Sequence, residues 1–278
     1  MRTKVPLREP VSAVGWWASW PAVLDRADGG FIVSDRTLAK LQAGGDRDRE
    51  TWPPAYFDRL HAEFPRYRDS VAREFDERLA PRVPAEWKTA AEEAHAIDAF
   101  SLDQLERLRA AGVSRFHAAY LPGLDILGHR IRERMQSGNS RAMLDARAVL
   151  ETHLDWLGVR IAELRLGTEN DGWLLIADPG RGAAAGDRGF WRAGGSGIRS
   201  NCVAEVDAAT AWFPWILHWG GFPVLEGRGV PPALAACLDP ASSPATVAAF
   251  PPPPESRGST SAFDDEMLER LRSLGYVQ

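Results

Sequence analysis

A carboxylate and an imidazole lie four residues apart at Asp125 and His129, within the stretch from Tyr120 to His129. Residues with this spacing share one face of a helical turn, so both side chains can reach one divalent cation. The alternative is an aspartate that caps the start of a helix and a histidine on the helix surface. By itself, the pair predicts either two ligands of a metal site or two ordinary helix residues.

The elements around this pair favour a functional position. Residues 114–121 form an apolar run typical of a buried strand, and a long helical pattern follows. This places Asp125 and His129 where a strand passes into a helix, which is where α/β folds hold their chemistry. A second apolar run, Trp173 to Asp178, is typical of a parallel strand covered on both faces. Its terminal Asp178 is either a second site carboxylate or a turn-forming residue.

Four further histidines are predicted to have no role in the site. His61 and His95 lie in charge-rich helical segments and are expected at the surface. His153 falls off the apolar stripe of its helix and is also expected to be exposed. That stripe consists of Leu150, Leu154, Leu157, Ile161 and Leu164. His117 lies inside the predicted strand, where a packed and hydrogen-bonded side chain is expected.

The composition is that of an ordinary soluble protein. The chain has 278 residues, of which 45% are hydrophobic and 26% charged, and its net charge of −5 gives no basic field for nucleic acid. No run approaches a membrane span, and the N-terminus lacks an apolar signal region. The only cysteines, Cys202 and Cys237, argue against a disulfide framework and against a thiolate metal cluster. A cytoplasmic location is therefore predicted.

A change of composition suggests how the chain is divided. The segment from Thr51 to Arg109 is charged and helix-forming, and its prolines, including Pro65, Pro81 and Pro84, predict several short helices. The predicted regions are a first part of an α/β core at 1–45, a helical insertion or cap at 46–112, the remainder of the core with the metal-site residues at 113–238, a Pro/Ser-rich linker at 239–262 and a C-terminal docking helix at 263–278.

An ordered set of motifs runs along most of the chain, at residues 14–21, 30–36, 120–129, 174–180, 190–199, 207–210, 221–223 and 271–277. In this order they resemble the bacterial type I phosphodiesterase / nucleotide pyrophosphatase branch of the alkaline phosphatase superfamily. The resemblance implies an α/β fold with a mostly parallel central sheet flanked by helices, with the helical segment as an insertion. It also implies metal-dependent hydrolysis of phosphate esters.

The departures from that family affect its catalytic site. The family's opening strand, with a metal-binding aspartate and a threonine or serine nucleophile, has no counterpart before Val14, so no catalytic residue is assigned. Pro179 stands where the family has a histidine ligand, and the segment 181–188 contains no histidine. The metal ligands that the resemblance implies are Asp125, His129 and Asp178, with Asp187 as a possible substitute oxygen ligand. The implied cofactor is a divalent metal such as Zn²⁺ or Mn²⁺.

Three functions follow from these residues. The first is a phosphodiesterase or phosphatase-like metal-dependent hydrolase that is truncated and weakly active or inactive alone. The second is a degenerate, non-catalytic member of the same superfamily that serves as a binding or scaffolding module. The third is a single-metal hydrolase that uses bound water as its nucleophile. The expected partners are a phosphate-ester small molecule and a second chain that completes the sheet.

Overall fold

The computed structural model describes residues 11–15, 32–34, 36–43, 51–53, 55–112, 114, 116–135, 140–164, 166, 171–177, 188–206, 208–239 and 245–249. All of these residues belong to the compact unit Leu7–Phe250. A second unit, Met1–Pro6 with Pro251–Gln278, lies outside the described residues.

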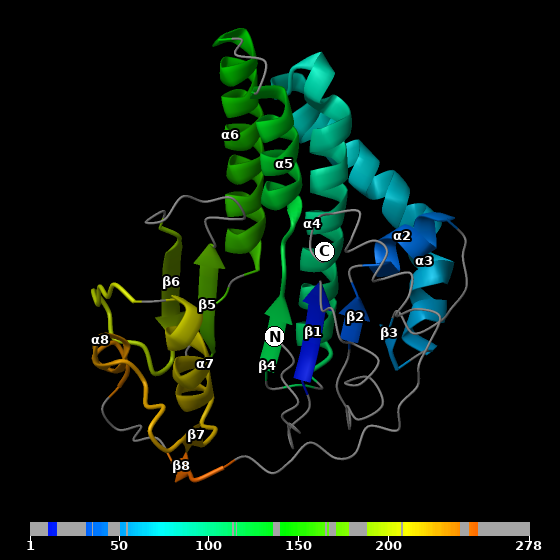
Figure 1. The fold of residues 1–278 in the computed structure, drawn as a ribbon. Helices are drawn as coiled ribbons and strands as arrows, with labels where there is room; N and C mark the ends of the chain where they lie inside the picture. The colour runs from blue at the N-terminus through cyan, green and yellow to red at the C-terminus, as the bar shows by residue number, and fades with distance from the viewer. Residues whose placement is uncertain are drawn as a thin grey trace, which may run out of the picture. The chain divides into compact units, whose positions relative to one another are not determined.

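Four long helices form the largest part of the described structure. Figure 1 shows α4, α5 and α6 side by side, and each of the three contacts the other two. Their apolar faces meet in one core that contains Trp87, Leu127 and Val149, all buried. The helices and helical turns of this part are α3 (Ala55–Glu74), the π-helical turn η1 (Phe75–Leu79), the 3-10 turns η2 (Ala80–Arg82) and η3 (Ala85–Trp87), α4 (Lys88–Ala110), α5 (Gly123–Met135) and α6 (Ser140–Glu163).

The prolines in this part interrupt the helices less than predicted. Helix α3 is 20 residues long and continues through Pro65, so the predicted break at that position was wrong. A proline inside a helix removes one hydrogen bond, but tertiary packing of an apolar face can offset this cost. The buried apolar face of α3 contains Phe57, Leu60 and Phe64. Pro81 and Pro84 do fall in the short turns between α3 and α4, as predicted.

A small mixed sheet packs with the first helices. Its strands follow the order β3-β2-β1-β4, with β1 parallel to β2 and to β4 and β2 antiparallel to β3. Val33 of β2 joins Phe57, Phe100 and Leu108 in a second apolar core. The elements are β1 (Val11–Gly15), β2 (Ile32–Ser34), α2 (Arg36–Ala43), β3 (Thr51–Trp52) and β4 (Phe116–Ala119).

The C-terminal part of the described chain is built around tryptophans. Trp215 is fully buried, and Trp191, Trp212 and Trp219 lie within 6.1 Å of it, ring centre to ring centre. Such large apolar surfaces dominate the packing of a small core. The elements are β5 (Gly172–Ala177), β6 (Phe190–Gly195), α7 (Ala208–Trp219), β7 (Val224–Leu225), α8 (Pro232–Ala235) and β8 (Thr246–Val247).

The predicted fold class was wrong. Helices make up 62% of the described residues, and the sheets are small, so no mostly parallel central sheet dominates this part of the chain. Strand β5 was expected to be covered on both faces, but it pairs antiparallel with β6 in a separate two-stranded sheet, and Ile176 is 42% exposed. The long helices bury their apolar faces mainly against one another.

The two cysteines also differ from the prediction, because Cys202 and Cys237 form a disulfide with their Cα atoms 5.3 Å apart. Two backbone hydrogen bonds bring their segments together, from the Arg199 N–H to the Cys237 carbonyl and from the Asp239 N–H to the Gly197 carbonyl. This pairing across 35 residues is tertiary and cannot be inferred from a cysteine count.

Two further predictions concern the chain as a whole. In the described part of the chain, no helix is both long and apolar enough to cross a bilayer. The predicted division into regions stays a prediction. Most of the linker at 239–262 and all of the docking helix at 263–278 lie outside the described residues.

Candidate functional site

The predicted strand-to-helix turn is present, with β4 ending at Ala119 and α5 beginning at Gly123. Leu127 is fully buried in the helical core. Asp125 and His129 each lie two positions from Leu127, which is a rotation of about 200° around the helix axis. Both side chains therefore lie on the opposite face of α5 and are partly exposed, at 39% and 48%.

The exposed pair offers two ligand atoms of different chemistry. His129 Nε2 lies 3.5 Å from Asp125 Oδ1. An imidazole nitrogen together with a carboxylate oxygen suits Zn²⁺, with the remaining positions taken by water. Among the described residues, no group of three or more His, Cys, Asp or Glu side chains is arranged to hold a metal. Asp178 and Asp187 lie outside the described residues, so their ligand roles stay predictions.

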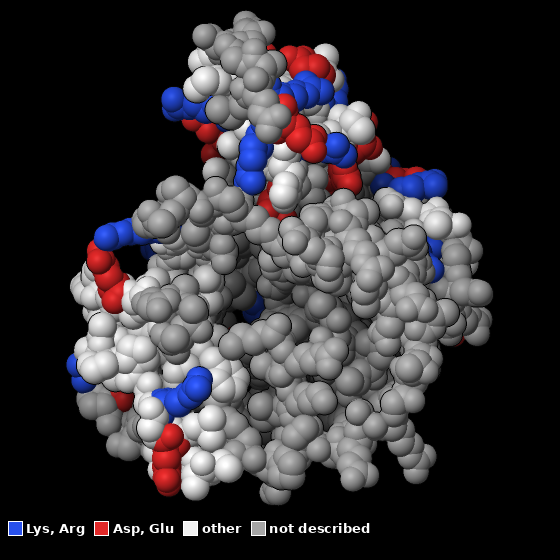
Figure 2. All heavy atoms as spheres, viewed as in Figure 1, with Lys and Arg blue, Asp and Glu red and all other residues white. Residues whose placement is uncertain are grey.

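Charges of both signs lie on α5 and on the neighbouring α6. Arg130 and Glu133 on α5 lie 3.6 Å apart, and Arg147 donates to Glu151 on α6 at 2.6 Å. Figure 2 shows basic and acidic side chains interspersed at the top of the view, where Figure 1 places the ends of the long helices. A mixed surface of this kind gives no extended positive field that would favour nucleic acid.

A second aspartate–histidine pair lies buried between the helices. Asp98 of α4 is fully buried and His153 of α6 is 1% exposed. His153 Nε2 lies 2.9 Å from Asp98 Oδ2. An ionised carboxylate can only accept, so with Asp98 ionised the donor in this contact is Nε2 of His153.

The same carboxylate reaches the start of α5. The backbone N–H of Gly123 donates to Asp98 Oδ1 at 2.9 Å. A Cβ atom at Gly123 would lie 2.3 Å from Asp98 Oδ2 and 2.7 Å from His153 Nε2. The approach of α5 to the buried pair therefore requires glycine at this position.

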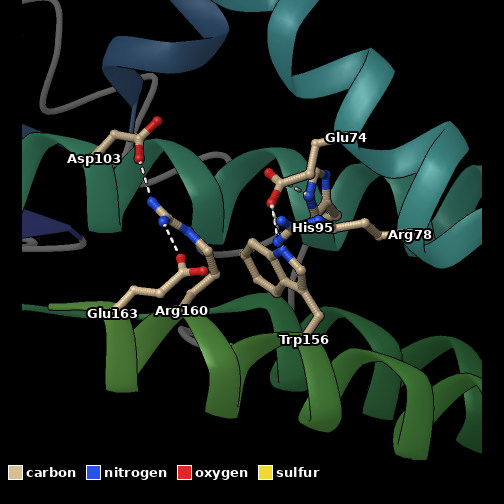
Figure 3. A network of polar contacts seen from close by, with 7 residues as sticks. All are labelled: Glu74, Arg78, His95, Asp103, Trp156, Arg160 and Glu163. Atoms are coloured by element: carbon tan, nitrogen blue, oxygen red, sulfur yellow. Dashed lines mark hydrogen bonds and ion pairs between the residues drawn. The ribbon is translucent and has the colours of Figure 1, made fainter.

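A third acid–histidine contact lies at the junction of α3 and η1 (Figure 3). His95 Nε2 lies 3.3 Å from Glu74 Oε2, and the Trp156 indole N–H donates to Glu74 Oε1 at 3.1 Å. The contact with His95, followed by the Trp156 hydrogen bond, lowers the pKa of Glu74 to about 2. His95 itself is fully buried, and its ring centre is 4.6 Å from that of Trp156.

Arg160 completes this network between α4 and α6 (Figure 3). Its guanidinium donates to Asp103 at 2.7 Å and to Glu163 at 2.6 Å. Burial raises the pKa of Asp103 despite the attraction of Arg160. These contacts satisfy charged groups between packed helices, so we assign them to structure.

The histidine predictions have mixed outcomes. His61 is exposed, and His117 is packed with Nε2 2.9 Å from the Ser114 carbonyl, so both predictions are confirmed. Burial lowers the pKa of His117. The predicted exposure of His95 and of His153 was wrong, because each is enclosed by packed helices that supply a carboxylate partner.

A better choice of helix stripe would have found His153. The predicted apolar stripe of α6 included Leu154, which is 48% exposed. The buried positions Val149, His153 and Trp156 also have helical spacing, and they share the inner face of α6 with Leu157 of the predicted stripe and with Leu164 of that stripe at its C-terminal end. Nothing in the sequence, however, indicates that Asp98 is the partner.

No protein-family model, no curated protein and no solved structure matches this chain. Its function must therefore be inferred from the exposed Asp125–His129 pair and the buried Asp98–His153 pair.

Proposed function

We propose that this chain binds a divalent cation through Asp125 and His129 and is related to metal-dependent phosphodiesterases and phosphatases, with weak or no hydrolysis when it acts alone. The observation that carries the proposal is the pair itself, in which a carboxylate oxygen and an imidazole nitrogen lie 3.5 Å apart on an accessible helix face. The resemblance of the ordered motifs to the type I phosphodiesterase branch supports the phosphate-ester chemistry.

The two residues would hold the cation, and the cation would act as a Lewis acid toward a phosphate oxygen. Asp125 supplies negative charge, and His129 supplies a neutral nitrogen ligand. Two protein ligands leave positions open for water and for a small phosphate ester. Neither residue is placed as a nucleophile, which is why we expect weak turnover.

A non-catalytic binding or scaffolding role is the second candidate. This role is favoured because the other acidic residues and histidines near the helical core already form structural contacts. Asp98, His153, Glu74 and His95 are engaged in buried contacts between helices, which leaves them poorly placed to assist a reaction. The single-metal hydrolase differs from this candidate only in turnover, so one assay separates them.

The expected partners and location stay predictions of this proposal. A second chain completing a sheet would pair with an edge strand, and β3 and β4 are the edges of the four-stranded sheet in the described part. The cytoplasmic location predicted from the sequence is opposed by the Cys202–Cys237 disulfide, since disulfides persist mainly in oxidising compartments. Thiol alkylation and mass measurement of protein trapped in cells would decide between these locations.

Zinc binding and turnover together test the proposal. Isothermal titration calorimetry should show one Zn²⁺ per chain, with affinity weakened at least about tenfold in Asp125→Ala and in His129→Ala. Asp69→Asn, an exposed change on α3, should leave the affinity unchanged. Equal affinity in all four proteins would contradict the assigned ligands.

Hydrolysis of bis(p-nitrophenyl) phosphate by the zinc-loaded protein distinguishes the candidate roles. Turnover that disappears in Asp125→Ala supports a hydrolase. Zinc binding without turnover excludes the single-metal hydrolase and agrees both with the non-catalytic module and with a truncated hydrolase that is inactive alone. Turnover that is unchanged in Asp125→Ala would indicate that a different site carries the activity.

A further inference from the structure

Asp98 meets two donors that come from two different helices. One of them is the N–H of Gly123, the first residue of α5. The first N–H groups of a helix have no acceptor within that helix, and a side-chain oxygen usually satisfies one of them. Asp98 performs this capping role from α4, across 25 residues of sequence.

His153 fixes the orientation of that carboxylate. A buried carboxylate is costly unless its oxygens are hydrogen-bonded, and the second oxygen of Asp98 is bonded by the imidazole of His153. The imidazole packs against Trp156, with ring centres 5.5 Å apart. With both oxygens engaged, Asp98 has a single orientation, and it directs one oxygen at the start of α5.

This contact bears directly on the exposed pair. Asp125 is only two residues beyond Gly123, in the first turn of α5. Leu127 and Ile131, which are buried, determine which face of α5 points to solvent. The Gly123–Asp98 contact fixes where the first turn begins, and it excludes any side chain at that point. The location of the Asp125 carboxylate therefore depends on Asp98.

We propose that Asp98, oriented by His153, is a positioning residue for cation binding at Asp125 and His129. It touches neither the cation nor a substrate and acts through the N-terminal turn of α5. This inference rests on the proposed function, since it concerns the same cation site.

The test measures Zn²⁺ affinity by calorimetry in the full chain with Asp98→Ala, Asp98→Asn and Gly158→Ala. Asp98→Ala removes the cap and should weaken binding at least about tenfold. Asp98→Asn keeps an acceptor for Gly123, and its NH2 group can donate to His153 Nε2 when the imidazole proton is on Nδ1, so affinity should stay within about threefold of the parent protein. Gly158→Ala lies on α6 with no atom within 4 Å of the added Cβ and should bind like the parent.

Amide hydrogen exchange of ¹⁵N-glycine-labelled protein supplies a local readout. In Asp98→Ala, the Gly123 amide should exchange at least about tenfold faster, while the Gly158 amide changes less. Because Asp98→Ala also lowers the stability of the whole protein, the decisive quantity is the ratio of the Gly123 exchange rate to the Gly158 exchange rate, and an unchanged ratio would overturn the positioning role.

The Zn²⁺ affinities of the parent protein and of Asp98→Ala distinguish a failure of the positioning role from a failure of the cation site. If the parent protein binds no Zn²⁺, the cation site and its positioning both fail. If the parent binds and Asp98→Ala binds equally well, only the positioning role fails. Should Asp98→Ala not fold, Gly123→Ala replaces it, because its Cβ displaces Asp98 while keeping every polar group. A tenfold loss there supports the role, and unchanged affinity overturns it.

Discussion

The two aspartate–histidine pairs contain the same chemical groups in opposite surroundings. Asp125 and His129 lie four residues apart on one helix, with side chains 39% and 48% exposed and 3.5 Å between their nearest atoms. Asp98 and His153 come from different helices 55 residues apart, are 0% and 1% exposed, and approach to 2.9 Å. This comparison shows that burial, rather than residue type, determines whether such a pair is structural or is accessible to a ligand.

Electrostatics gives the reason. An exposed ion pair contributes about 0.2–1 kcal/mol, because water and salt screen it. A buried pair contributes little compared with well-packed apolar residues, but removing one partner leaves an uncompensated polar group or charge, at a cost of about 3–5 kcal/mol. The buried pair is therefore constrained by stability, whereas the exposed pair is free to be used in binding.

The largest expected effect is the loss of Asp98. Asp98→Ala should reduce the free energy of unfolding by about 3–5 kcal/mol, because the Gly123 N–H and the His153 imidazole both lose their acceptor. Asp125→Ala should change it by no more than about 0.5 kcal/mol. Urea unfolding followed by tryptophan fluorescence measures both. Similar losses in the two variants would remove the distinction between the pairs.

The next effect concerns the glycines of α5. Gly123→Ala should destabilise the protein by about 1–3 kcal/mol, since its Cβ would overlap Asp98. The matched change Gly128→Ala, on the same helix with open space around the added Cβ, should stabilise it by up to about 1 kcal/mol. The same urea experiment applies. A neutral Gly123→Ala would show that the start of α5 is not held closely against the buried pair.

The Glu74–His95 contact is intermediate, with a carboxylate 25% exposed and a histidine fully buried. The pKa of Glu74 falls from 4.5 to about 2 on folding. Its stabilising contribution is therefore complete above pH 4.5 and is lost as the pH falls toward 2. Glu74→Gln should reduce the fall in melting temperature between pH 6 and pH 2, measured by thermal unfolding. An equal fall in Glu74→Gln and in the parent protein would show that another carboxylate is responsible.

The smallest effect is the coupling within the exposed pair. A double-mutant cycle of Asp125→Ala with His129→Ala should give a coupling energy below about 0.5 kcal/mol in the absence of metal, and salt should reduce it further. The equivalent cycle on Asp98 and His153 should give a clearly larger value. Equal couplings would mean that the two environments differ less than their exposures indicate.

Local patterns predicted several elements well. The strand-to-helix turn before Asp125 and the strand at Phe116–Ala119 occur where the sequence indicates them. Each depends on residues close together in the chain: an apolar run, helical spacing, or a glycine and a proline at a boundary.

Other predictions failed where distant segments compete for the same contacts. The apolar run at Trp173 was compatible with a strand covered on both faces, but its partner is the antiparallel β6. Helix α3 continues through Pro65 because its buried face packs in the core. His153 was assigned to the wrong face of α6 because two overlapping stripes both have helical spacing.

The sequence by itself determined that Asp125 and His129 share a helix face, because a spacing of four residues in a helix leaves no other arrangement. Only the tertiary structure decided that this face is exposed, that His153 is buried against Asp98, and that Cys202 reaches Cys237. The physical reason is that helical spacing is set by backbone hydrogen bonds within a few residues. Burial and pairing are set by how whole elements pack, and that information is distributed over the chain.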